Sequence, residues 1–172
     1  MTIIHDRDLF ILSIEEDVCN MQIGDIAADF SAESTRGRIR LSDYRGKNIV
    51  LYFYVKDMTP GCTRQSIALK DTIDTIRSLG AEVIGVSSDD LSMHIKFAEK
   101  YSLTFPLVAD TDNSISKAYG VYNEERKRAK RVTFIIDREG IIRHIMNRVD
   151  VDTHAEDVIN ILKELNKKDS NT

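Results

Sequence analysis

Cys62 stands where a thiol can act as a nucleophile. It follows an apolar run at residues 49–55 and a polar loop at residues 56–61, and it opens a segment with the pattern of a long helix. Free backbone N–H groups and the positive end of the helix dipole favour a thiolate at the start of a helix. We therefore interpret Cys62 as a reactive thiol. The alternative is a small buried hydrophobic residue, which is how most free cysteines behave.

A hydroxyl group lies three residues before this thiol. The segment Thr59-Pro-Gly-Cys62 occupies the place of a C-x-x-C redox motif, with threonine in place of the first cysteine. A dithiol forms a disulfide, whereas a thiolate beside a hydroxyl can bind and attack an oxygen substrate. The spacing therefore favours attack on an oxygen-containing substrate over disulfide exchange.

The elements that must position this thiol alternate between strands and helices. The run at residues 49–55 is typical of a strand buried on both faces, and a helix is expected at residues 63–79. The other expected strands are residues 83–87, 105–109, 132–137 and 141–146, and the other expected helices are residues 90–101, 113–119 and 153–165. This order predicts an α/β fold with a central mixed β-sheet flanked by helices on both faces.

Three details of these elements can be tested directly. In the helix at residues 90–101, the spacing of Leu91, Ile95 and Ala98 predicts the buried face. The segment Arg138-Glu-Gly140 predicts the turn of a hairpin between two strands. The last helix opens with Thr153-x-x-Glu156, the pattern of a capping box.

Length and composition describe one globular domain. The 172 residues are 42% hydrophobic and 30% charged, and the net charge of −4 argues against an overall nucleic-acid-binding surface. The chain has two cysteines and lacks both a signal peptide and an apolar run of about 20 residues, so we expect a cytoplasmic protein without a membrane partner. We expect an extension at residues 1–20 with an edge strand at 9–14, a domain at 21–165 and a polar tail at 166–172.

The residues around Cys62 carry a family resemblance. Val55-x-x-x-Thr59-x-x-Cys62 resembles the P-x-x-x-T-x-x-C signature of the peroxiredoxins. The string YFYVKDMTPGCT is similar to their Q type, the bacterioferritin-comigratory proteins of the alkyl hydroperoxide reductase/thiol-specific antioxidant family. Further segments match in order over residues 21–165, namely 24–30, 41–46, 97–101, 105–107 and 131–134. The resemblance implies a thioredoxin-like fold and a thiol-dependent peroxidase.

The resemblance also implies roles for single residues. Cys62 attacks the peroxide, Thr59 hydrogen-bonds it, and Arg131 stabilises the thiolate and polarises the peroxide. Gln65 matches a Glu or Gln that helps to hold this arginine. The charge that moves onto the departing oxygen is expected to meet Arg131, the Thr59 hydroxyl and the N–H groups of Gly61 and Cys62. The product is a sulfenic acid.

Three positions depart from the family pattern. Val55 and Ala28 each replace a proline, and Val55 is compact enough to shield the thiolate. Ile67 stands five residues after Cys62, where many Q-type members carry a resolving cysteine. Cys19 is the other thiol of the chain and the candidate resolving residue, but nothing in the sequence brings it to Cys62.

We therefore predict a one-Cys cycle without a cofactor. Its substrates are hydrogen peroxide and organic hydroperoxides, its reductant is an external thiol or a thioredoxin-like protein, and the enzyme is a monomer or a dimer. Two alternatives remain open from the residues. One is a thioredoxin-like disulfide oxidoreductase, and the other is a redox-sensing binding or holdase protein.

The remaining charged and histidine residues are interpreted as structural. The basic cluster at residues 124–131 is expected to be a solvated loop, apart from Arg131 at the start of a strand. The histidines lack metal-ligand spacing, so no metal is predicted. His94 is expected on a helix surface, His144 in a hairpin strand and His154 in the first turn of a helix. A further alternative, a Cys-His hydrolase, would need His94 or His154 beside Cys62, and the sequence gives no sign of this.

Overall fold

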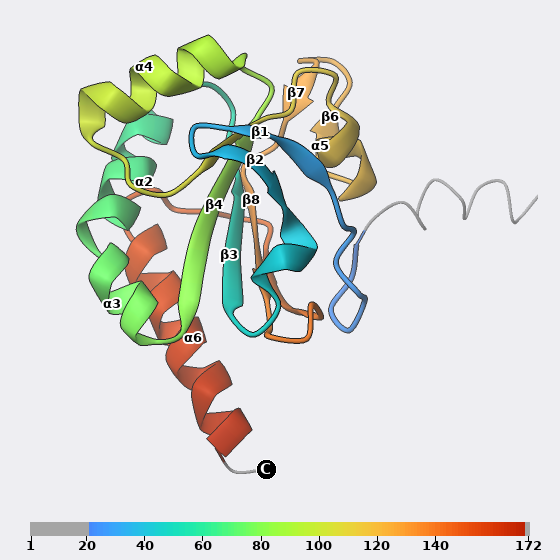
Figure 1. Ribbon diagram of the computed structural model, residues 1–172, viewed down its shortest axis with the longest axis vertical. Helices are drawn as coiled ribbons and strands as arrows, with labels where there is room; N and C mark the ends of the chain where they lie inside the picture. The colour runs from blue at the N-terminus through green and yellow to red at the C-terminus, as the bar shows by residue number, and fades with distance from the viewer. Residues whose placement is uncertain (1–20, 171–172) are drawn as a thin grey trace, which may run out of the picture.

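The computed structural model describes residues 21–170, and its centre is a seven-stranded mixed sheet (Figure 1). The strand order is β2-β1-β5-β4-β3-β8-β9, in which β3, β4 and β5 are parallel and the remaining pairs are antiparallel. The strands are β1 (Ser31–Ser34), β2 (Gly37–Arg40), β3 (Asn48–Phe53), β4 (Ala81–Ser87), β5 (Leu107–Ala109), β8 (Val132–Ile136) and β9 (Ile142–Met146). The predicted mixed sheet is confirmed.

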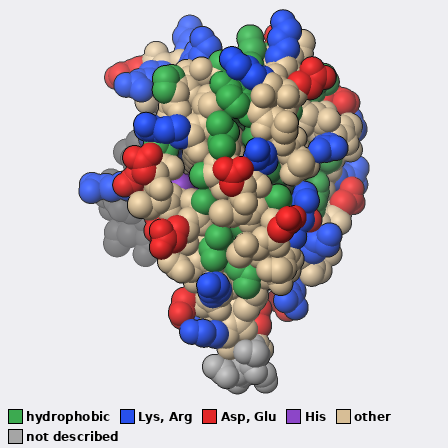
Figure 2. Space-filling model, turned by 90° about the vertical axis from the view of Figure 1, so that its left-hand side faces the viewer, with side chains coloured by type: hydrophobic (Ala, Val, Ile, Leu, Met, Phe, Trp, Pro, Cys, Tyr) green, Lys and Arg blue, Asp and Glu red, His purple; other side chains and the backbone are tan. Residues whose placement is uncertain are grey.

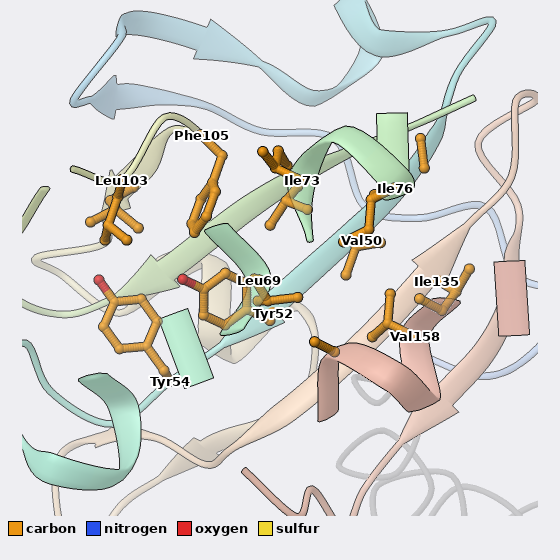
Figure 3. Packing of buried hydrophobic residues seen from close by; sticks show 14 of the residues in the cluster. Val50, Tyr52, Tyr54, Leu69, Ile73, Ile76, Leu103, Phe105, Ile135 and Val158 are labelled. Carbon is orange, nitrogen blue, oxygen red and sulfur yellow. The ribbon is translucent and has the colours of Figure 1, made fainter. Parts of the chain in front are cut away.

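The central strand β3 is buried on both faces because successive side chains point to opposite sides of a sheet. Val50 and Tyr52 enter one hydrophobic cluster, part of which Figure 3 shows, and the odd-numbered side chains of β3 enter the other. The first cluster is covered by α2 (Pro60–Asp71), α3 (Ile73–Ser78), α4 (Leu91–Tyr101) and α6 (His154–Ser170). The second is covered by α5 (Ser114–Ala118) and the 3-10 helix η1 (Leu41–Tyr44). Helices therefore flank both faces of the sheet, as predicted.

The helix that contains Cys62 differs from the prediction at both ends. It begins at Pro60 rather than residue 63, and it ends at Asp71, with Thr72 between it and α3. The Thr72 hydroxyl donates to the carbonyl oxygen of Ala68 at 2.8 Å, a side-chain bond that competes with regular helix geometry. The single helix expected over residues 63–79 is therefore two helices.

The buried face of α4 was predicted wrongly. Its fully buried residues are His94 and Phe97, whereas Ile95 is 40% exposed and Leu91 and Ala98 are half-buried. The sequence analysis placed His94 on the helix surface, and this prediction is also wrong, because the side chain is buried. The apolar spacing failed here because a polar side chain occupies the face that packs on the sheet.

Helix α6 is longer than predicted and has a different start. It continues to Ser170, five residues past the expected end, and Asn166 lies half-buried and donates to the Leu79 carbonyl at 2.9 Å. Most of the predicted polar tail is therefore helical. The Thr153 hydroxyl donates to the Asp157 carboxylate at 2.9 Å, which is not the capping-box arrangement. The predicted extension at residues 1–20 and its edge strand lie outside the described residues.

Two small antiparallel pairs had no counterpart in the sequence analysis. The strands β1 and β2 form a hairpin at one edge of the sheet. Within the basic segment expected to be a loop, β7 (Arg128–Ala129) pairs with β6 (Tyr122–Asn123), and the Ala129 side chain is buried. The hairpin between β8 and β9 is confirmed, and His144 lies in β9 as expected.

One face of the molecule carries mixed charge. Figure 2 shows the face that holds the helices on the left of Figure 1, and on it basic and acidic side chains are interspersed. The mixture on this face agrees with the mild net charge of −4. Among residues 21–170, we find no helix with the length and apolar character needed to span a membrane.

Candidate active site

Cys62 lies in the first turn of α2, next to the carboxyl end of the central strand β3. Thr59 is the N-cap of this helix, and Pro60 is its first residue, a position where the missing N–H of proline costs little. The Cys62 side chain is fully buried, and its thiol is free. The buried strand therefore delivers the sulfur to a helix N-terminus beneath the surface.

The start of α2 leaves two backbone donors without a partner in the helix. The first helical hydrogen bond runs from the Thr63 N–H to the Thr59 carbonyl at 2.9 Å, so the N–H groups of Gly61 and Cys62 precede the first helical donor. The Thr59 side chain does not cap them, and its hydroxyl donates to the Lys56 carbonyl at 2.7 Å. Such free N–H groups form an anion-binding position.

Arg131 reaches the sulfur from the residue before β8. Its Nη2 donates to Cys62 Sγ at 3.4 Å, and its Nη1 donates to Gln65 Oε1 at 2.8 Å. Gln65 is fully buried and lies one helical turn after Cys62 in α2, so the guanidinium spans two side chains on one face of the helix. The guanidinium therefore places a positive charge and an N–H donor at hydrogen-bond distance from the sulfur.

Gly61 provides the space for this guanidinium. A Cβ atom at this position would lie 3.1 Å from Arg131 Nη2, closer than ordinary van der Waals contact. The absence of a side chain therefore lets the arginine lie over the start of α2. Val55, the other expected supporting residue, is half-buried and packs against the hydrophobic cluster that contains Cys62.

Behind Gln65 lies a histidine that the sequence analysis did not connect with the site. His154 begins α6 as predicted, but its ring is fully buried. Its Nδ1 lies 3.3 Å from Gln65 Nε2 and its Nε2 lies 2.9 Å from Thr133 Oγ1. Burial lowers the pKa of His154 to about 4, with a further lowering by Arg131 and an opposing effect of Asp157. The ring is therefore neutral at pH 7.

A second buried group anchors the loop before Cys62. The Asp57 carboxylate lies 2.6 Å from His94 Nδ1 and accepts a hydrogen bond from the Tyr54 hydroxyl at 2.6 Å. The Asp57 N–H donates to the Asp89 carboxylate at 2.9 Å, and His94 Nε2 lies 2.9 Å from the Val108 carbonyl. Burial raises the pKa of Tyr54, which keeps its hydroxyl protonated as a donor. Both histidines thus bond to residues other than Cys62, which removes the support for a Cys-His hydrolase.

The same group includes the one set of potential metal ligands found among residues 21–170. Ligand atoms of Asp57, Asp89 and His94 lie within 4.8 Å of one another. However, the 2.6 Å separation between the Asp57 oxygen and the His94 nitrogen is that of a hydrogen bond. The Asp89 carboxylate also accepts from the Ser87 hydroxyl at 2.7 Å and from the Asp57 N–H. These bonds explain the cluster as an anchor for the loop.

The structure brings together most of the residues that the sequence singled out. Cys62, Thr59, Gly61, Gln65 and Arg131 lie at the start of α2 or at the entrance to β8. Cys19 lies outside the described residues. His154 was missed because a lone histidine at a helix start carries no sequence signal for its partners in α2 and β8.

Comparison with known proteins agrees with this geometry. The model of the AhpC/TSA family matches residues 23–145. The chain is 36% identical to Peroxiredoxin Bcp of Escherichia coli over 151 residues, 84% of this chain and 97% of that protein. It is 37% identical to Peroxiredoxin Bcp of Bacillus subtilis, over 86% of this chain and 99% of that protein. A crystal structure of a Xylella fastidiosa PrxQ mutant superposes with a TM-score of 0.80 at 33% identity, covering 84% and 97% of the two chains. The thioredoxin-like fold is thereby confirmed.

Proposed function

Because the chain belongs to the AhpC/TSA family and is a thiol peroxidase of the Bcp/PrxQ type, we propose that Cys62 is its peroxidatic residue and works in a one-Cys cycle. The observation that carries this assignment is the Arg131 guanidinium, held 3.4 Å from Sγ at the start of α2. Family membership sets aside the two alternatives left open by the residues, a disulfide oxidoreductase and a non-enzymatic redox sensor.

In the first step the Cys62 thiolate attacks the terminal, proton-bearing oxygen of the peroxide ROOH. An S–O bond forms, the O–O bond breaks, and the departing oxygen takes up a proton to leave as water or an alcohol. The sulfur is oxidised to a sulfenic acid. Arg131 and the N–H groups of Gly61 and Cys62 supply positive charge and donors for the negative charge that develops on the oxygens.

Thr59 positions the substrate in this proposal. Its hydroxyl hydrogen is used on the Lys56 carbonyl, so its oxygen presents lone pairs to an incoming group. A hydroperoxide carries one O–H donor and can give it to Thr59 while its oxygens accept from Arg131. This pairing orients the O–O bond toward the sulfur and favours hydroperoxides over disulfides as substrates.

Two external thiols complete the cycle. The first attacks the sulfenic sulfur, the S–O bond breaks, and water leaves with formation of a mixed disulfide. The second attacks that disulfide and releases the Cys62 thiol. Ile67 occupies the place of the resolving cysteine of many Q-type proteins, so α2 cannot form its own disulfide. We accordingly propose a monomer or dimer that works with a small thiol or a thioredoxin-like protein in the cytoplasm.

The experiment that tests the cycle is mass spectrometry after one equivalent of peroxide without reductant, on the wild type and on Cys19→Ser. A sulfenic acid on Cys62 in both proteins, with unchanged turnover in excess small thiol, supports the one-Cys cycle. A Cys19–Cys62 disulfide, within or between chains, with faster over-oxidation of the Cys19→Ser variant, establishes a two-Cys cycle instead. The absence of peroxide consumption by the reduced wild type contradicts the peroxidatic role of Cys62.

A further inference from the structure

A chain of hydrogen bonds connects the sulfur of Cys62 with a buried ring on the last helix. Cys62 Sγ accepts from Arg131, Arg131 donates to Gln65, Gln65 contacts His154, and His154 contacts Thr133. Gln65, His154 and Thr133 are fully or almost fully buried, so water does not substitute freely for any of these partners.

The donors and acceptors available on each side chain determine the direction of every hydrogen bond in this chain. Arginine only donates, so Gln65 faces Arg131 with its oxygen and must face His154 with its NH2 group. His154 Nδ1 therefore accepts and carries no hydrogen. In a neutral ring the hydrogen then lies on Nε2, which donates to the Thr133 hydroxyl. One tautomer of one histidine satisfies all of the contacts.

We propose that His154 is a positioning residue for the peroxidatic centre: its unprotonated Nδ1 holds the Gln65 amide with the oxygen toward Arg131. The guanidinium is thereby held on Cys62 Sγ. This inference rests on one part of the proposed function, namely that Cys62 is the reactive residue.

The surroundings of the ring favour the neutral state that this role requires. Burial of the ring is the main cause that lowers the His154 pKa, Asp157, one turn along α6, opposes it, and the positive charge of Arg131 adds to the lowering. The Tyr52 ring packs with its centroid 6.3 Å from that of His154, and burial raises the pKa of Tyr52 so that it stays neutral. If His154 gained a proton on Nδ1, two donors would face each other. The Gln65 amide would then have to rotate and present its NH2 group to Arg131.

Two substitutions of nearly equal shape distinguish the hydrogen-bond acceptor at position 154 from the packing of the side chain there. His154→Asn keeps an oxygen near the place of Nδ1, whereas His154→Leu keeps the shape of asparagine and removes the acceptor. Both lose the ring and the bond to Thr133. The readouts are the rate of Cys62 alkylation by iodoacetamide, the pH midpoint of thiolate absorbance, and the rate of peroxide attack. Urea unfolding of each variant serves as the control for its stability.

We expect His154→Leu to react with peroxide about three- to tenfold more slowly than His154→Asn, as loss of one hydrogen bond implies. We also expect its thiolate to form at higher pH. Equal rates and midpoints in the two folded variants overturn the proposal, whether both match the wild type or both are equally slow. Alkylation and absorbance need no turnover, so they test His154 even if Cys62 proves not to be peroxidatic.

Nitrogen NMR of the wild type tests the tautomer without any substitution and remains decisive if the variants do not fold. At pH 7 the His154 ring should show an unprotonated Nδ1 and a protonated Nε2. A ring protonated on Nδ1, or on both nitrogens, overturns the proposal.

Discussion

Replacing Arg131 by methionine is the most direct test of how the fold activates the thiol. Methionine keeps an unbranched apolar stem but removes the charge and both hydrogen bonds of arginine, to Cys62 Sγ at 3.4 Å and to Gln65 Oε1 at 2.8 Å. A hydrogen bond to a charged group contributes about 1.5–3 kcal/mol. If all of this acts in the transition state, peroxide attack slows roughly ten- to a hundredfold.

The assay is stopped-flow measurement of peroxide attack on the reduced protein at several pH values, so that loss of thiolate is separated from loss of transition-state stabilisation. Arg131→Lys should fall between the wild type and Arg131→Met, because an ammonium keeps the charge but lacks the two-armed geometry. Single changes of the neighbouring basic residues serve as controls and should leave the rate within about twofold of the wild type, which is less than one lost hydrogen bond. These neighbours are Arg126, Lys127, Arg128 and Lys130. An Arg131→Met protein as fast as the wild type, or a control variant that is slower, refutes the assignment.

Three further outcomes are expected. Cys62→Ser should keep the fold, as judged by circular dichroism, and lose peroxidase turnover, because serine lacks an accessible anion at neutral pH; substantial residual turnover would exclude Cys62 from the reaction. Gly61→Ala should slow peroxide attack several-fold while leaving the urea midpoint nearly unchanged, because the new Cβ displaces Arg131 Nη2 from a 3.1 Å contact; a rate equal to the wild type would show that the guanidinium tolerates the shift. The pKa of His154, lowered to about 4 by burial, is below its unfolded value of about 6.5, so the neutral ring stabilises the fold above pH 6.5 and this contribution is lost as the pH falls toward 4. The free energy of unfolding should thus fall by roughly 2 kcal/mol from this group between pH 7 and pH 5, and His154→Asn should lack that part of the decrease.

The segment around Cys62 could be interpreted from the sequence because its signals are local. The apolar run at residues 49–55 predicts a strand buried on both faces, and β3 covers its first five residues together with Asn48. The polar loop predicts a helix start at residue 63, and α2 begins three residues earlier, at Pro60. Backbone preferences and the alternation of side chains act over a few residues, so a short window of sequence contains them.

Two of the errors fall where a long-range polar contact overrides a local pattern. In α4 the apolar spacing favoured Ile95 as a core residue, but His94 takes the buried face because it bonds to Asp57 in the loop after β3. In α6 the polar residue Asn166 was assigned to a tail, yet it is tied to the Leu79 carbonyl and to Asn48. Hydropathy describes how a residue partitions and contains no information about which distant group will accept its hydrogen bonds.

By itself, the sequence determined the spacing of the Thr59 hydroxyl and the Cys62 thiol at a helix start, because these residues lie within one turn. Only the tertiary structure decided what surrounds the sulfur. Arg131 meets Gln65 across 66 residues, and His154 meets Gln65 across 89. These contacts exist because β8 pairs with β3 and because α6 packs against α2 on the same face of the sheet. The direction of each hydrogen bond then follows from the donors and acceptors that packing has placed together.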